Sequence, residues 1–68
     1  MNKALLDYEM NRRSISKAFM CEILGMSRSA FYRKCTGQSE FTQSEIQKIV
    51  DVLHLDSPVP IFFNERVS

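Results

Sequence analysis

Residues 15–37, with the sequence ISKAFMCEILGMSRSAFYRKCTG, constrain the fold of this 68-residue chain more than any other stretch. Apolar residues recur there at helical spacing on both sides of a short break, Leu24-Gly25-Met26-Ser27. A helix that stops and reverses within three residues commonly needs a left-handed backbone, which glycine adopts at little cost, so Gly25 suits this break. The stretch therefore predicts a helix-turn-helix, with Met26 pointing inward.

Three positions share one signature of a helix start, a hydroxyl residue between two apolar residues that are five positions apart. The hydroxyl oxygen accepts a hydrogen bond from a free backbone N–H, and the apolar pair fixes the angle at which the chain enters the helix. The sets are Ile15-Ser16 with Met20, Met26-Ser27 with Phe31, and Phe41-Thr42 with Ile46. In the third set Glu45 lies three residues after Thr42 and completes a capping box.

The whole pattern predicts about five helical pieces and no strand, hence an all-α fold with a single domain over residues 1–68. A chain of this size builds one modest core and has no room for a second catalytic or ligand-sensing domain. The first helix should cover about Lys3 to Arg12, with Leu5, Leu6 and Met10 on one side.

A further helix should run from about Gln43 to His54 and end before Asp56-Ser57-Pro58, where Asp56 or Ser57 could cap a last short turn. We expect the residues that follow, Ile61 to Phe63, to fold back onto the core. The core side of the longer helix should carry Ile46, Ile49, Val50 and Leu53.

The charge is distributed unevenly, although the net charge is only +1. From Arg12 to Lys34 six basic residues face one acid, Glu22, which gives a local charge of +5. From Glu40 onward five acids face two basic residues, which gives −3. Such asymmetry can reflect two solvated faces, but together with a helix-turn-helix it favours a surface that binds nucleic acid.

The second helix of the motif should present a polar outer face, because Phe31 and Cys35 share its inner face at i, i+4 spacing. Arginine can donate two hydrogen bonds to guanine, so Arg28 or Arg33 is the expected guanine contact, although Arg33 could equally contact a phosphate. Serine can pair with several bases or a phosphate, and a tyrosine ring can touch a thymine methyl group or only cover the helix. The outer face would hold Arg28, Ser29, Tyr32 and Arg33.

Nearly the whole chain resembles the phage-repressor and Cro type of helix-turn-helix domain, a family of compact, five-helix, lambda-repressor-like DNA-binding modules. Residues 16–37 carry the most specific part of the resemblance, followed by Glu40-Phe41-Thr42, Ile46-x-x-Ile49 and residues 61–64. The resemblance implies that Arg28 and Ser29 are the base-reading positions, with Tyr32 and Arg33 one turn further along.

The resemblance also implies contacts to the DNA backbone. Lys17 stands at the start of its helix, where the family usually has glutamine, and would contact a phosphate beside the groove. Lys34 is expected either to contact a phosphate or only to aid solubility. The full set of expected backbone-contacting residues is Lys17, Ser27, Lys34, Thr36, Gln38 and Ser39.

These features predict a cytoplasmic Cro-like repressor that binds double-stranded operator DNA as a homodimer, with recognition helices in major grooves about 34 Å apart. A repressor fragment, an antitoxin or a host regulator of the same fold would look alike. From a different class, a protein-binding module that modulates another repressor also fits the near-neutral total charge.

Phe19 and Ile23 depart from the family pattern, which is commonly charged or polar at these positions. They widen the apolar arc of their helix to about 200°, whereas one core contact needs a stripe of roughly 100°. Either Phe62 or Phe63 covers them, which we favour, or they form a protein interface.

Other function classes find little support in the sequence. No apolar run approaches the roughly 20 residues of a membrane span. Cys21 and Cys35 lack CxxC spacing and partner histidines, so we expect core thiols and no zinc. His54 is alone, and no serine lies in a GxSxG motif. We therefore expect no enzymatic activity, metal, cofactor, small-molecule ligand or membrane association.

Overall fold

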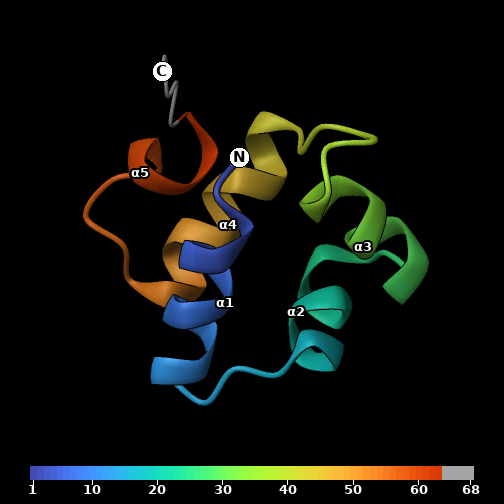
Figure 1. The fold of residues 1–68 in the computed structure, drawn as a ribbon. Helices are drawn as coiled ribbons and strands as arrows, with labels where there is room; N and C mark the ends of the chain where they lie inside the picture. Colours follow the sequence, from blue (N-terminus) through green and yellow to red (C-terminus); the bar gives the residue numbers. More distant parts are fainter. Residues whose placement is uncertain (64–68) are drawn as a thin grey trace.

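The computed structural model describes residues 1–63, which form five helices and no strand (Figure 1). The expected all-α fold with a helix-turn-helix is confirmed. The helices are α1 (Lys3–Arg12), α2 (Lys17–Leu24), α3 (Arg28–Cys35), α4 (Gln43–Leu53) and α5 (Val59–Phe62).

All three predicted helix caps are present. In each, the side-chain oxygen of the capping residue accepts a hydrogen bond from the backbone N–H three residues later. The Glu45 carboxylate also accepts the Thr42 N–H, which completes the capping box. The bonds run from Phe19 to Ser16, from Ala30 to Ser27 and from Glu45 to Thr42.

The turn between α2 and α3 is built on Gly25, whose φ angle of 69° lies in the left-handed region. This conformation lets the Met26 N–H donate to the Cys21 carbonyl over 3.1 Å, so the last turn of α2 closes on itself. Met26 packs against the core, as predicted. Gly25 is therefore needed for its backbone conformation.

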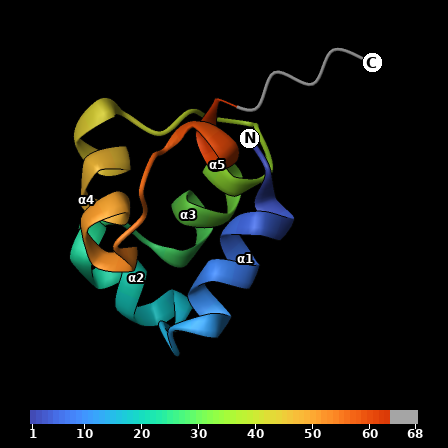
Figure 2. The same cartoon turned by 90° about the vertical axis from the view of Figure 1, so that its left-hand side faces the viewer.

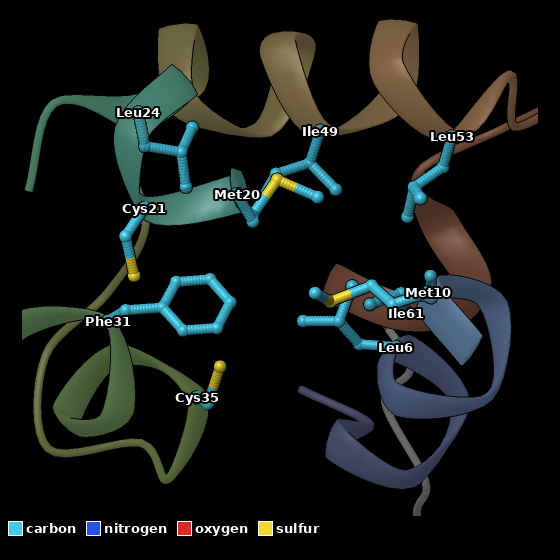
Figure 3. Packing of buried hydrophobic residues seen from close by; sticks show 10 residues of the cluster. All are labelled: Leu6, Met10, Met20, Cys21, Leu24, Phe31, Cys35, Ile49, Leu53 and Ile61. Atoms are coloured by element: carbon cyan, nitrogen blue, oxygen red, sulfur yellow. The ribbon is translucent and has the colours of Figure 1, made fainter. Parts of the chain in front are cut away.

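One buried cluster receives side chains from every helix (Figure 3). Both cysteines belong to it as free thiols, as predicted. Phe31 points from α3 toward the centre of the cluster (Figure 3). The buried residues are Leu6, Met10, Met20, Cys21, Leu24, Phe31, Cys35, Ile49, Leu53 and Ile61.

The buried face of α4 differs from the prediction. Ile49 and Leu53 are fully buried, but Ile46 and Val50 are only half-buried, and Val52 packs against the core instead. The buried side of α4 is thus centred on Ile49 and Leu53, and Ile46 and Val50 lie at its edge. The helix also ends at Leu53, one residue early, because the next residue adopts a left-handed conformation.

The start of α1 is joined to α5, and Figure 2 shows α5 beside the N-terminal end of the chain. The Asn2 N–H donates to the Ile61 carbonyl over 2.7 Å, and the Asn2 side chain caps α1 by accepting the Leu5 N–H. This cap was not predicted from the sequence. The junction fixes where the C-terminal aromatic residues can reach.

The aromatic rings pack differently from the favoured expectation. Phe62 makes an edge-to-face contact with Phe41 at 5.5 Å between ring centroids, and Phe41 makes a second one with Phe31 at 5.9 Å. Phe63 is 50 % exposed, and Phe19 is 45 % exposed. The expectation that Phe62 or Phe63 covers Phe19 is therefore wrong, because α5 packs against α1 and the Phe62 ring packs against the Phe41 ring.

We predict that Gly25→Ala lowers the free energy of unfolding by about 1 kcal/mol, because alanine resists a left-handed backbone. A methyl group there meets no atom within 4 Å, so steric overlap adds nothing. Gly25→Asn should lose less, since asparagine tolerates this region. Urea unfolding measures the difference, and equal stability of all three proteins would contradict the role given to Gly25.

Candidate functional site

The outer face of α3 carries the four side chains that the sequence predicted there. Arg28, Ser29, Tyr32 and Arg33 are all exposed, and Tyr32 is 59 % exposed. They face outward because Phe31 and Cys35 occupy the opposite side of a helix of only eight residues. This face offers two guanidinium groups and two hydroxyl groups to a ligand.

A surface hollow of about 450 Å³ lies beside this face and gathers residues from several elements. We call it the α3 hollow. Lys3 from α1, Lys17 from α2 and Gln38 from the loop after α3 line it together with the four outer-face residues. Phe31 and Cys35 also contribute to its wall. The structure thus brings Lys17 and Gln38 to the predicted base-reading residues.

The α3 hollow is lined by four basic side chains, Lys3, Lys17, Arg28 and Arg33, and by no acidic side chain of the described residues. Asp7 lies next to it. One carboxylate oxygen of Asp7 is 2.9 Å from the Lys3 ammonium group, and the other is 3.8 Å from that of Lys17. The hydrogen bond and the charge of Asp7 raise the pKa of Lys3 above its ordinary value, so Lys3 stays charged.

The other basic residues of the Arg12–Lys34 segment lie elsewhere. Arg12 and Arg13 form ion pairs with Glu9 at the end of α1, and Arg12 lies 5.9 Å from the Tyr8 ring centroid. Hence the local charge of +5 in the sequence does not form one continuous surface. Lys3 was not predicted as a site residue, because its only local signal is its i, i+4 spacing to Asp7.

Lys34 does not line the α3 hollow. Its ammonium group is 2.7 Å from a Glu45 carboxylate oxygen, and each of the two side chains is 18 % exposed. The same oxygen accepts the Thr42 N–H over 2.9 Å. In the free protein this side chain therefore joins α3 to the N-terminus of α4, and a DNA backbone contact by Lys34 stays a prediction.

The acid in this pair has a shifted pKa. Burial raises the pKa of Glu45, but the hydrogen bond from Lys34, the backbone and side chain of Thr42 and the Lys34 charge together outweigh it. The pKa of Glu45 therefore lies below its ordinary value. The ionised form of Glu45 is the one that holds Lys34 and caps α4.

The residues after α3 separate into two groups. Thr36 caps the end of α3, and its hydroxyl group donates to the Arg33 carbonyl over 3.2 Å. Gln38 lines the α3 hollow, whereas Ser39 lines a different hollow of about 380 Å³ together with Lys34. The structure therefore does not bring Ser39 and Lys34 to the predicted base-reading residues.

Two further predicted residues have clear positions. Ser27 is exposed, and its oxygen is used as the cap of α3. On α2, Phe19 is exposed and Ile23 is half-buried, and neither packs against the buried cluster. An uncovered apolar side chain on α2 is thus available to a partner.

The remaining reactive groups offer little chemistry. Burial, with a smaller effect of the Asp7 charge, raises the pKa of the Cys35 thiol to about 11, so it stays protonated at neutral pH. Within residues 1–63, no three His, Cys, Asp or Glu side chains form a group that could hold a metal ion. No helix in this part of the chain is long and apolar enough to cross a membrane.

The chain matches a known family of protein domains. The family model described as BetR domain matches residues 2–65, which is almost the full length of the chain. No curated protein and no solved structure matches the chain.

We predict that the Lys34–Glu45 pair stabilises the fold at neutral pH and not in acid. The folded-state pKa of Glu45 is below its ordinary value of 4.5. The contribution of the pair to the free energy of unfolding is therefore complete above pH 4.5, and it is lost as the pH falls through the folded-state pKa. Urea unfolding should show Glu45→Gln less stable than wild type by about 1 kcal/mol at pH 7, with convergence in acid.

Lys34→Met removes the other partner and should show the same convergence with wild type at low pH. A stability difference between wild type and Glu45→Gln that does not change with pH would mean that the ion pair contributes nothing.

Proposed function

The chain belongs to the BetR domain family, which suggests a small regulatory domain, and on that premise we propose that it is a sequence-specific DNA-binding regulator of transcription. One observation carries the proposal. The exposed face of the second helix of a helix-turn-helix borders a hollow lined by four basic side chains. Phosphates provide most of the affinity of such proteins, and side chains with several hydrogen-bond donors provide the specificity.

In the proposed complex α3 lies in the major groove of double-stranded DNA. Arg28 occupies the first helical position of α3, and Arg33 follows more than one turn later, so the two can address different base pairs. Each can donate two hydrogen bonds to guanine O6 and N7. Ser29 and Tyr32 lie between them and adjust the preference at neighbouring bases.

The backbone contacts come from the rim of the α3 hollow. Lys17 at the first position of α2 and Gln38 after α3 lie on it, and both can donate to phosphate oxygens. Ser27 and Thr36 are the exposed capping residues at the two ends of α3, and their hydroxyl groups are the further candidates for phosphate contacts. Such contacts fix the depth and angle of α3 in the groove.

We further propose a Cro-like repressor that acts in the bacterial cytoplasm as a homodimer. A single domain of this size reads only one half-site, which gives weak binding. Two copies related by two-fold symmetry would place their α3 helices about 34 Å apart, in successive major grooves of an inverted repeat. Occupancy of such an operator would block RNA polymerase.

A second candidate function is modulation of another repressor through protein contacts. The exposed Phe19 favours it, because a large apolar side chain without cover is suited to a protein interface. Salt separates the two functions. DNA binding through several phosphates weakens steeply with rising salt, whereas association through Phe19 and Ile23 hardly changes.

We predict that the purified protein enriches an inverted repeat from a random duplex library. Arg28→Ala should reduce the preference at one base pair of each half-site by about 1–3 kcal/mol. Arg12→Ala removes an exposed arginine outside the α3 hollow and should leave the preference unchanged. Absence of enrichment at low salt would favour the protein-binding function instead.

We also predict that Phe19→Glu abolishes dimerisation or partner binding while the domain stays folded. The reason is that burying a carboxylate in an apolar interface costs free energy. Sedimentation measures the oligomeric state, and circular dichroism measures the fold. Tyr8→Glu, at another exposed aromatic residue, serves as the control. Unfolding of the Phe19 variant would assign Phe19 to the core instead.

A further inference from the structure

The ion pairs around Asp7 connect α1 to the α3 hollow. Lys3 and Lys17 belong to different helices, yet both approach the same carboxylate, at 2.9 Å and 3.8 Å. Both lysine residues also line the α3 hollow. Lys3 and Lys17 are 41 % and 48 % exposed, so a ligand in the hollow can reach them.

Asp7 also borders a second, smaller hollow that Lys17 and Arg28 line with it. The carboxylate is thus placed among three cations of the candidate site, Lys3, Lys17 and Arg28. In the described part of the chain Asp7 forms ion pairs with Lys3 and Lys17, and it shares the lining of the smaller hollow with Arg28. A carboxylate held in this way presents to the lysines the same charge and oxygen atoms that a DNA phosphate would present.

We propose that Lys3 and Lys17 bind one stretch of the DNA phosphate backbone and that Asp7 occupies them in the free protein as an internal competitor. This inference rests on the proposed function of DNA binding. It adds α1 to the interface, and it makes Asp7 a residue that weakens binding to every DNA sequence alike. A phosphate takes the place of the Asp7 carboxylate when the duplex docks.

The arrangement acts only on the part of the affinity that does not depend on DNA sequence. Phosphate contacts add affinity without regard to sequence, so every unopposed lysine strengthens binding to wrong sites as much as to the operator. A carboxylate beside the lysines reduces this uniform part and leaves the base contacts of α3 untouched. Asp7 thereby lowers the affinity for the operator and the affinity for random DNA by the same factor, and the ratio of the two affinities stays the same.

The test measures affinity for a selected duplex and for random duplex over a range of salt concentrations. Lys3→Ala should weaken binding to both and lower the slope of log affinity against log salt by about 0.9, the value for one phosphate contact. Lys48→Ala removes the same charge from an exposed position on α4, and it should leave the slope unchanged.

Asp7→Asn should strengthen binding to both duplexes by the same factor, about two- to fivefold, as expected for the loss of a partly exposed ion pair. Asp51→Asn on α4 should have no such effect. In the Lys3→Ala background the gain from Asp7→Asn should be smaller, because part of the competition acts through Lys3. Circular dichroism should show all variants folded.

The outcomes separate this inference from the proposed function. If the wild-type protein selects a sequence and Arg28→Ala disturbs it, but Lys3→Ala leaves the salt slope unchanged or Asp7→Asn weakens binding, the inference is overturned and the proposed function stands. If the wild-type protein binds no duplex at low salt, the proposed function itself fails.

Discussion

The burial of Phe31 determines how α3 lies on the rest of the molecule. Its ring is almost completely enclosed and meets the Phe41 ring, which in turn meets Phe62 of α5. A helix with one inward ring and Cys35 one turn later has a fixed rotation, so the opposite side must face solvent. The candidate base-reading residues are thus positioned by a contact that none of them makes.

Local signals predicted the helices well because the interactions behind them are local. The side chains of Ser16, Ser27 and Thr42 each accept a hydrogen bond from the N–H three positions later. Gly25 is required by the left-handed backbone of the turn in which it lies. The outward face of α3 followed from the spacing of Phe31 and Cys35 in the same way. The side chains that α3 exposes could therefore be predicted from the sequence alone.

Contacts between distant segments were not predictable in this way. The partner of Lys34 is eleven positions along the chain, and whether its ammonium group is free or paired depends on how α4 packs against α3. From the sequence, Lys3 was only the first residue of a helix, and Phe62 or Phe63 was the expected cover of Phe19 and Ile23. In each case the contact depends on how two helices pack against each other. No short stretch of the sequence contains that information.

The hydrogen bond between Asn2 and Ile61 has a consequence for how the chain folds. It joins the first helix to the last, so almost the whole described chain must close into a loop before it forms, and loop closure over such a span carries a large entropy cost. Neighbouring helices such as α2 and α3 need no such search. We expect the α1–α5 junction to be the late event in folding, and the two ends of the domain to unfold together.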